Sequence, residues 1–357
     1  MVSIQIREPA LAWSFGAGAR RHVQREGLQV DDIDLLMGAS GGPKWLVLAG
    51  LDRYLFGHWL QQRNRPLDMA ASSIGSWRFA CLAQQQPLAA IDRFLEAYLD
   101  QTYTRDATAA DVSRVLDAVL SHLLGESGIG EILAHPYFRS HVFTVRALGW
   151  LKSEQRFKQS LGLLRSYGAN LLGRSRLGRF FERAVFVDSR SPGDFPVADG
   201  LHAYRIPLNQ ANLELALRAS GAVPLVLSGI ADIPGAPQGV YRDGGVLDYH
   251  FDAAMVERRA LVFYPHFYSH CIPGWFDKSL KWRHQTVKQW DNTVMVAPSS
   301  GFVARLPGGK IPDRKDFFSM TDAERVAYWR RVVAESERLA DAFRDVVEHE
   351  RVGELVV

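Results

Sequence analysis

Residues 67–83, LDMAASSIGSWRFACLA, constrain the fold more than any other stretch of the chain. The residues before Ser73 form a short apolar run that ends in small side chains, and the apolar positions after Gly75 recur at helical spacing. A strand, a tight turn and a helix make up a nucleophile elbow, which holds a serine at the tip of a sharp bend. Such a bend crowds the backbone and needs small neighbours, which Ala71 and Gly75 provide. The pattern predicts Ser73 at the tip; the alternative is a serine-rich loop in which Ser72 or Ser73 caps the helix.

A second strand–turn–helix pattern comes earlier in the chain. Residues 30–37 have a buried-strand pattern, residues 38–44 read GASGGPK, and residues 45–59 have helical spacing. Ser40 fits Gly-x-Ser-x-Gly and is therefore a second candidate nucleophile. A phosphate loop is a weaker interpretation, because no Gly-Lys-Ser/Thr follows and Pro43 lacks an amide hydrogen. The glycines also suit an oxyanion hole, since their amides can point at a negative oxygen, or an ordinary turn without a ligand.

Composition excludes several classes of protein. The chain has 357 residues, of which 47% are hydrophobic and 23% charged, so it can bury a large core and is not expected to be disordered. Its two cysteines, Cys81 and Cys271, are far apart and lack zinc-site spacing, which indicates a reducing compartment and no metal centre. The first residues contain no apolar stretch typical of a signal peptide, and no run is long enough to span a bilayer. We therefore expect a cytoplasmic protein.

Strand and helix patterns alternate along the chain. Further strand candidates are residues 3–7, 141–148, 184–188, 204–206, 260–264 and 292–297. Helix candidates are residues 88–124, with a second helix starting at 108–111, residues 213–222, and a C-terminal helical region at about 320–350. Thr321 and Glu324 form the capping box of that last helix. Since no linker or repeat interrupts this order, we expect a single domain over residues 1–357.

Residues 152–183 carry an unusual concentration of basic side chains. They are Lys152, Arg156, Lys158, Arg165, Arg174, Arg176, Arg179 and Arg183, against only Glu154 and Glu182. Leucines and phenylalanines are interleaved with them, a pattern typical of helices that lie on anionic membranes. The alternative is a solvated helical insertion whose apolar side covers the core. No nucleic-acid-binding motif accompanies the charge, so nucleic acid is not expected as a partner.

Four segments occur in an order that resembles the patatin-like phospholipase family. They are Ser40-Gly41-Gly42-Pro43-Lys44-Trp45, Ala71-Ser72-Ser73-Ile74-Gly75, Leu217-Arg218-Ala219-Ser220-Gly221-Ala222-Val223-Pro224 and Asp243-Gly244-Gly245. In the family they correspond to a glycine-rich loop, a Gly-x-Ser-x-Gly elbow, an Ala-x-Arg-Ala-Ser-x-Ala-x-Pro stretch and an Asp-Gly-Gly or Asp-Gly-Ala turn. The resemblance covers about residues 30–250, and four motifs in order are more specific than any one of them.

The resemblance implies a three-layer α/β/α fold with a mostly parallel central sheet, helical insertions and a C-terminal helix. It also implies a lipid acyl hydrolase that uses a Ser-Asp dyad and needs no cofactor. Ser73 corresponds to the nucleophile and Asp243 to the base, while the amides of Gly41 and Gly42 correspond to the oxyanion hole. Lys44 corresponds to the basic residue of the loop, for which we expect either an anion contact or a structural role.

The chain departs from the family pattern at several positions. Ala71 replaces the first glycine of the elbow, and Ser40 and Trp45 replace glycines of the loop. The elbow is followed by Ser76 and Trp77, where small residues are usual, which is expected to narrow the acyl pocket. These changes concern the range of substrates more than the type of reaction.

Two other functions remain open from the sequence. The chain could be an α/β-hydrolase in which Ser40 is the nucleophile and His250 or His266 is the base. It could also be a lipid-binding relative that kept the fold and lost turnover. By motif order the resemblance assigns Ser40 to the oxyanion loop, which favours the Ser-Asp dyad.

Overall fold

The computed structural model describes residues 9–104, 106–191, 200–251, 261–349 and 351–355. The strand predicted at residues 3–7 lies outside this part of the chain, as does the first residue of the strand predicted at 260–264. The other strands and helices predicted from apolar patterns are present, with boundaries that differ by a few residues.

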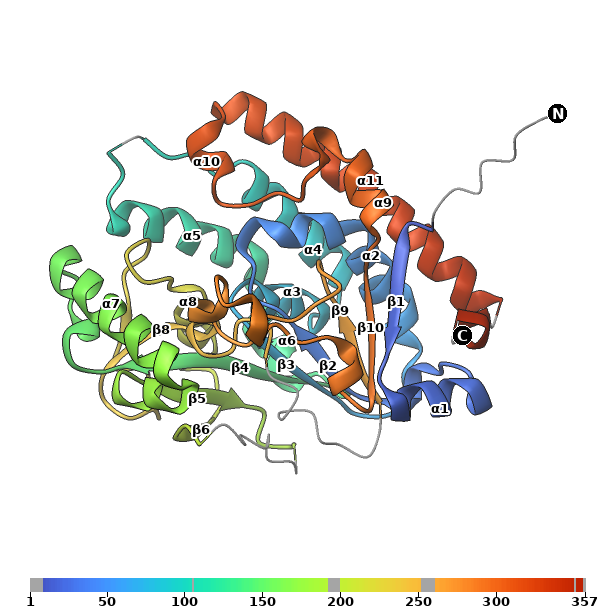
Figure 1. Ribbon diagram of the computed structural model, residues 1–357, viewed down its shortest axis with the longest axis horizontal. Coiled ribbons are helices and arrows are strands. Elements are labelled where there is room, and N and C mark those ends of the chain that lie inside the picture. The colour runs from blue at the N-terminus through green and yellow to red at the C-terminus, as the bar shows by residue number, and fades with distance from the viewer. Residues whose placement is uncertain (1–8, 105, 192–199, 252–260, 350, 356–357) are drawn as a thin grey trace.

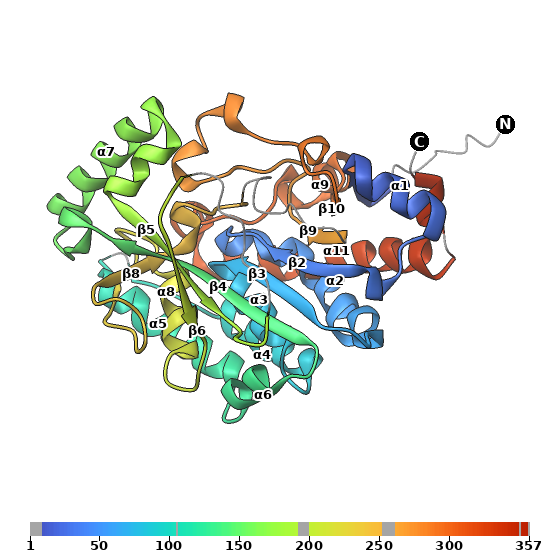
Figure 2. The same cartoon turned by 90° about the horizontal axis from the view of Figure 1, so that it is seen from below.

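A mixed β-sheet forms the centre of the molecule. Its strands are β1 (Leu11–Phe15), β2 (Ile33–Gly38), β3 (Leu67–Ser72), β4 (Phe138–Ala147), β5 (Phe181–Val187), β6 (Ala203–Pro207), β7 (Ile230–Ala231), β8 (Val240–Asp243), β9 (Leu261–Pro265) and β10 (Thr293–Pro298). The order along the sheet is β1-β10-β9-β2-β3-β4-β5-β6. The central run from β10 to β4 is parallel, whereas β1 and β5 join it antiparallel. With helices flanking this sheet (Figures 1 and 2), the protein has an α/β fold, as predicted.

Strand β4 is long enough to serve two neighbours along one edge. Its first six residues, 138–143, pair in parallel with β3, and residues 144–147 pair antiparallel with β8. Strand β8 therefore pairs with the same edge of β4, starting where the pairing with β3 ends. The end of β3 and the end of β8 meet there, beside the middle of β4.

Along the sequence, the helices lie before, between and after these strands. They are α1 (Ala17–Glu26), α2 (Ala49–Tyr54), α3 (Ile74–Leu82), α4 (Pro87–Leu99), α5 (Ala109–Leu124), α6 (Gly128–Ala134), α7 (Arg156–Leu172), α8 (Leu213–Gly221), α9 (Ser300–Arg305), α10 (Asp316–Ser319) and α11 (Asp322–Glu348). In both ribbon views α7 and α1 lie at opposite ends of the molecule, and α11 runs along one side near α2 and α4. Thr108 and Thr321 cap α5 and α11 with full capping boxes, as their sequences indicate.

The segment predicted as one helix after the glycine-rich loop is helical throughout but not uniform. It winds as a 3-10 helix over Gly42–Leu48, as an α-helix in α2, and as a π-helix over Leu55–Trp59. A side chain at Gly50 would lie 2.6 Å from the backbone nitrogen of Glu337 in α11. The two helices therefore approach closely at this glycine.

The basic segment does not form one exposed insertion. Its α-helix, α7, covers only Arg156–Leu172, and the segment ends inside strand β5. Arg183 belongs to that strand and is buried in an ion pair with Asp248, with 2.7 Å between Nε and Oδ2. The prediction that Arg183 contributes to a basic face was wrong, because an apolar β-strand places this residue in the core.

Within the described residues, no helix combines the length and the apolar character needed to cross a bilayer. The longest helix, α11, has a capped start and many charged positions. Cys81 and Cys271 are both buried free thiols.

Candidate active site

The turn after β3 has the geometry of a nucleophile elbow. Ser73 links β3 to α3 with φ 54° and ψ −131°, a backbone conformation that is strained for any residue other than glycine. Such strain costs about 1–3 kcal/mol and persists only where the surroundings impose it. At Gly75 a side chain would lie 2.5 Å from the carbonyl carbon of Gly38, so this position has no room for one. The glycine at position 75 is therefore required by the packing of α3 against β2.

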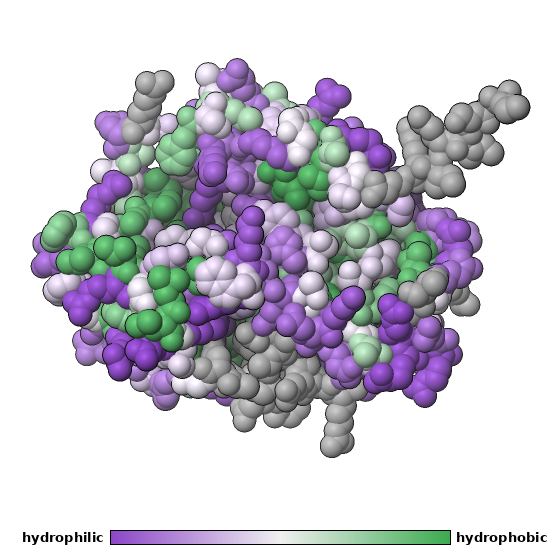
Figure 3. Space-filling model, in the orientation of Figure 1, coloured by the Kyte–Doolittle hydropathy of each residue, from purple (hydrophilic) through white to green (hydrophobic). Residues whose placement is uncertain are grey.

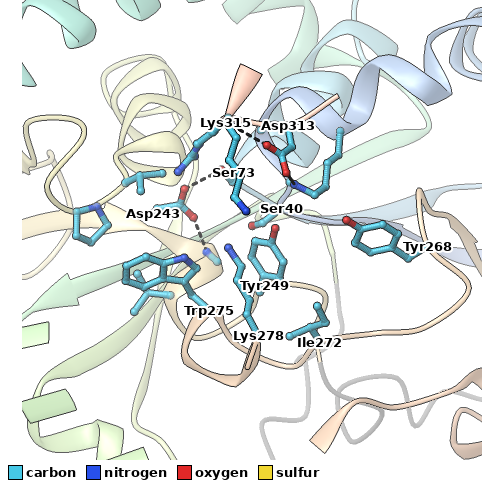
Figure 4. Close-up of a pocket in the computed structure, with 18 residues that line it drawn as sticks. Ser40, Ser73, Asp243, Tyr249, Tyr268, Ile272, Trp275, Lys278, Asp313 and Lys315 are labelled. Carbon is cyan, nitrogen blue, oxygen red and sulfur yellow. Dashed lines mark hydrogen bonds and ion pairs between the residues drawn. The ribbon is translucent and has the colours of Figure 1, made fainter. Parts of the chain in front are cut away.

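The hydroxyl of Ser73 meets the carboxylate of Asp243. Ser73 Oγ donates a hydrogen bond to Asp243 Oδ2 at 2.8 Å, and the amide of Gly245 donates to Asp243 Oδ1 at 2.7 Å. Both side chains are nearly buried, since Ser73 is 5% and Asp243 4% exposed. Figure 4 shows the two side chains pointing toward each other at the wall of a cavity.

Burial raises the pKa of Asp243 above its ordinary value. The positive charge of Arg314 and the hydrogen bonds from Ser73 and Gly245 oppose this effect but do not cancel it. A carboxylate with a raised pKa is a stronger base than an exposed one. Asp243 is therefore chemically suited to take a proton from Ser73.

Helix α8 supports both residues of this pair. The hydroxyl of Ser220 accepts a hydrogen bond from the amide of Ser73 at 2.8 Å and donates to the carbonyl of Phe143 in β4 at 2.7 Å. One residue after α8, the carbonyl of Ala222 accepts from the amide of Asp243 at 3.0 Å. The Arg-Ala-Ser-Gly-Ala stretch thus holds the backbone on both sides of the hydrogen bond.

The glycine-rich loop lies beside the same pair. Gly41 and Gly42 line a cavity together with Ser73 and Asp243. Gly42 starts the 3-10 helix at φ 54°, where glycine is favoured. Among the described residues, no acceptor is in hydrogen-bonding position for the amides of Gly41 and Gly42. Both amides are therefore available to a negatively charged oxygen, as the oxyanion-hole interpretation requires.

Ser40 has a different environment from Ser73. Its hydroxyl contacts the hydroxyl of Ser72, which in turn donates to the carbonyl of Asp248 at 2.7 Å. Ser40 lines the cavity next to Gly245. A side chain added at Gly245 would collide with the hydroxyl of Ser40. Ser40 therefore packs the loop against the turn that follows Asp243.

The two histidines considered as bases are buried and engaged elsewhere. His250 Nδ1 accepts from the amide of Ile272 at 3.2 Å, and His266 Nδ1 accepts from the amide of Tyr268 at 2.8 Å. Burial lowers the pKa of both rings, that of His266 to about 3. In the described part of the chain, neither ring is hydrogen-bonded to Ser40.

Lys44 lines the cavity and faces a carboxylate. Its ammonium group is 3.9 Å from Asp313, and burial lowers its pKa. Both roles expected for this residue, a structural contact and contact with an anion in the cavity, are compatible with this position.

The cavity beside Ser73 and Asp243 has a volume of about 410 Å³ and a cationic wall. Besides Lys44, this wall contains Arg314 and the two lysines labelled in Figure 4, Lys278 and Lys315. Sequence reasoning missed these three residues. They lie in segments without a recognisable motif, and only the fold brings them to the serine.

A larger cavity of about 990 Å³ begins at the same serine. Its wall includes many apolar side chains, among them Trp77, Leu116, Leu225 and Phe317. Trp77, expected to narrow an acyl pocket, does form part of this wall, and its indole donates to the carbonyl of Leu217 at 2.9 Å.

Both cavities share part of their lining. Gly42, Ser73 and Arg314 line the smaller and the larger cavity alike. The hydroxyl of Ser73 therefore stands where the cavity with the cationic wall meets the larger cavity. Among the described residues, no group of three or more His, Cys, Asp or Glu side chains is arranged to hold a metal ion.

Comparison with known proteins yields one structural neighbour. No protein-family model matches the chain, and no curated protein matches its sequence. Among solved structures, human GIVD cytosolic phospholipase A2 is similar over 99% of this chain and 67% of that chain, with a TM-score of 0.34 and 11% sequence identity. A structural similarity of this size does not show which activity the protein has.

Proposed function

We propose that this protein is a serine hydrolase that cleaves acyl esters of lipids through Ser73 and Asp243. The observation that carries the proposal is the 2.8 Å hydrogen bond from Ser73 to Asp243 at a strained turn between two cavities. The four motifs that resemble patatin-like phospholipases support the same assignment.

The mechanism follows from the contacts of the two residues. Asp243 accepts the proton of Ser73 while the serine oxygen attacks the acyl carbonyl. The amides of Gly41 and Gly42 stabilise the negative oxygen of the tetrahedral intermediate, an effect worth about 3 kcal/mol per donor in comparable sites. Protonated Asp243 then gives its proton to the leaving alcohol, which leaves an acyl-enzyme. A water molecule, activated by Asp243, releases the acid.

The two cavities suggest how an ester would be oriented. The larger cavity, whose wall includes Trp77, Leu116 and Leu225, offers space for an acyl chain, and the smaller cavity offers charged groups for the alcohol. Because both begin at Ser73, an ester placed across them has its carbonyl at the nucleophile.

Labelling with a fluorophosphonate probe, followed by peptide mapping, tests the proposal. We expect the adduct on Ser73, and we expect Ser73→Ala to lose labelling and hydrolysis of p-nitrophenyl esters. Ser40→Ala should keep a substantial part of both. An adduct on Ser40 would favour the alternative nucleophile, and no adduct on any serine would favour a lipid-binding relative without turnover.

We also propose that α7 attaches the protein to anionic membranes. Phe157, Leu164 and Leu171 are seven residues apart and therefore lie on one side of the helix. This side faces solvent, since Phe157 is 79%, Leu164 66% and the neighbouring Leu172 72% exposed. Figure 3 shows hydrophobic side chains gathered over α7 at the left of the view.

Basic side chains surround this apolar side. Those exposed on or next to α7 are Lys152, Arg156, Lys158, Arg165, Arg176 and Arg179. Trp150, which is itself exposed, lies under the guanidinium of Arg165 at 5.2 Å. Exposed aromatic and leucine side chains next to basic ones match the composition of helices that lie in the interface of an anionic bilayer.

The other side of α7 is tied to the walls of both cavities. Asn170 Nδ2 donates to Asp277 Oδ1 at 2.7 Å, close to the segment that carries Lys278. At the other end, Gln159 accepts from the amide of Leu225, and Arg156 and Leu225 line the larger cavity. Helix α7 therefore connects the proposed membrane-binding side with the walls of both cavities.

A further inference from the structure

Lys278 brings an amine into the smaller cavity without a carboxylate partner. The residue follows a short 3-10 helix, Trp275–Asp277, and lines the same cavity as the proposed dyad. Its nitrogen lies 4.0 Å from the centre of the Tyr249 ring and 5.6 Å from that of Trp275. Within the described chain, Lys278 forms no ion pair. Figure 4 shows its side chain extending into the cavity, so the amine is presented to a molecule bound there.

The charges around this amine disfavour its protonated form. Although the residue as a whole is exposed, its amine is desolvated, and the positive charges of Arg314 and Lys44 act in the same direction. The negative charges of Asp243 and Asp313 act in the opposite direction and offset only part of this effect. Together these effects lower the pKa of Lys278 to about 7, so a large share of the amine is uncharged at neutral pH. An uncharged amine has a free electron pair and is a nucleophile.

A guanidinium group without a carboxylate faces the same cavity. Arg314 lines the cavity, and its positive charge acts on both Lys278 and Asp243. A side chain at Gly42 would lie 3.2 Å from Arg314 Nε, so the guanidinium packs against the glycine-rich loop. Among the described residues, Arg314 forms no ion pair either. A guanidinium can bind a carboxylate through two parallel hydrogen bonds, so Arg314 is suited to bind a small carboxylate here.

We propose that Lys278 is a nucleophile that forms a Schiff base with a 2-oxo acid, whose carboxylate is bound by Arg314. In a 2-oxo acid the carboxylate is bonded directly to the carbonyl carbon, so an amine and a guanidinium that face one cavity can engage both groups. A cavity of about 410 Å³ has ample room for a molecule of this size. This activity goes beyond ester hydrolysis and uses a nucleophile other than Ser73.

The step is a condensation that needs no oxidant or reductant. The electron pair of Lys278 Nζ attacks the carbonyl carbon, which forms a carbon–nitrogen bond and moves the π electrons of the carbonyl group onto oxygen. The two amine hydrogens then leave with that oxygen as water, and the nitrogen supplies the electrons of the second carbon–nitrogen bond. Lysines that form Schiff bases in enzymes are typically desolvated or lie beside another cation, as Lys278 does.

Reductive trapping tests the proposal on the full chain. We would incubate the protein at pH 7.5 with pyruvate or with its neutral analogue pyruvamide, reduce it with sodium cyanoborohydride, and map the modified lysines by peptide mass spectrometry. A free lysine side chain has a pKa of about 10.4, so about one in a thousand is uncharged at this pH. Lys281 is the internal control, because it is exposed, three residues from Lys278 and not part of the cavity wall. We expect at least tenfold more pyruvate adduct on Lys278 than on Lys281.

A variant at Arg314 tests the contact with the carboxylate. In the unaltered protein, pyruvate should give at least tenfold more adduct on Lys278 than pyruvamide does. Arg314→Gln should abolish this preference. Because both probes react with the same amine, their ratio does not depend on a change in the reactivity of Lys278. Arg305→Gln in α9 is the matched control, since Arg305 is exposed and lines neither cavity, and it should keep the preference.

The other outcomes contradict the proposal. Adduct spread equally over Lys278 and Lys281, or absent from Lys278, would show that Lys278 is not a special nucleophile. Equal trapping of the two probes, or a preference that survives in Arg314→Gln, would rule out the carboxylate contact and with it the class of ligand. The comparisons on the unaltered protein need no variant to fold. Because trapping detects an amine adduct and not turnover of an ester, its result is independent of whether Ser73 hydrolyses esters.

Discussion

Ser72 and Asp243 pair with consecutive residues of strand β4, Ser72 with Phe143 and Asp243 with Thr144. The register of one strand therefore brings together Ser73 and Asp243, which lie 170 positions apart in the chain. Ser73, one residue beyond the end of β3, turns back toward the end of β8. The distance between the two side chains is thus set by hydrogen bonds of the sheet and does not depend on a flexible loop.

Asp243→Asn is expected to abolish hydrolysis while stabilising the fold. The amide keeps the shape of the carboxylate but is no base, so kcat should fall about 10²–10⁴-fold. The pKa of Asp243 is raised in the folded protein, so the folded state holds its proton more tightly than the unfolded chain does, and ionisation at higher pH costs stability. The variant should therefore unfold at a higher temperature than the wild type at pH 8, and the difference should shrink as the pH falls through the raised pKa.

Thermal unfolding at pH 5 and pH 8, together with kcat for a p-nitrophenyl ester, checks both parts. The wild type should also lose activity on acidification as Asp243 is protonated. Undiminished turnover in Asp243→Asn would remove this residue from the mechanism.

Ser220→Ala should damage the elbow without touching the reacting groups. It leaves the amide of Ser73 without its acceptor, at a cost of about 1–3 kcal/mol, and removes the hydroxyl that donates to the carbonyl of Phe143. We expect kcat to fall at least tenfold with little change in KM. Ser336→Ala is the matched control, because the buried hydroxyl of Ser336 in α11 also accepts from a backbone amide, that of Gly50 at 2.8 Å, and donates to a carbonyl, that of Val333 at 2.6 Å, away from the elbow. If both variants had equal kcat, Ser220 would have no special role at the elbow.

Gly75→Ala is expected to destabilise the protein and to displace Ser73. The added methyl group would meet the carbonyl of Gly38, and backbone cannot yield as a side chain can. Overpacking of this kind costs about 1–3 kcal/mol. Gly130→Ala in α6 is the control, because among the described residues beyond its own turn of helix no atom lies within 4 Å of the new methyl group, and alanine favours a helix by up to about 1 kcal/mol. Denaturant unfolding measures the free energy of unfolding of both variants. Equal values would show that α3 can shift away from β2 to make room for the methyl group.

Leu164→Asp should weaken binding to anionic vesicles. Burial of one leucine in the interface is worth about 1.5–3 kcal/mol, so partitioning should fall by about tenfold or more. The measurement is co-sedimentation with vesicles of phosphatidylglycerol and phosphatidylcholine, with pure phosphatidylcholine as the lipid control. Leu355→Asp provides a control at the other end of the molecule, where another exposed leucine follows α11. Equal losses in both variants, or equal binding to both lipids, would contradict a specific role for α7.

Local sequence signals were reliable where local chemistry decides the structure. Helices start at Thr108 and at the capping box of Thr321 as predicted, and the small residues around Ser73 form the expected bend. The pattern of basic residues over 152–183 fails at its end, because charge alone does not reveal that Arg183 lies in strand β5. Its ion pair with Asp248 is a contact between residues 65 positions apart, which no local pattern contains.

The sequence by itself determined the turns, the strands and the helices, and hence which residues could act as nucleophile, base and oxyanion hole. Only the tertiary structure decided that Ser73 meets Asp243, since the shared neighbour β4 sets that distance through its register. It also decided that Lys278 and Arg314 face the same cavity. The physical reason is that turns and caps depend on neighbours in the chain, whereas strand pairing and the convergence of charges depend on which distant segments pack together.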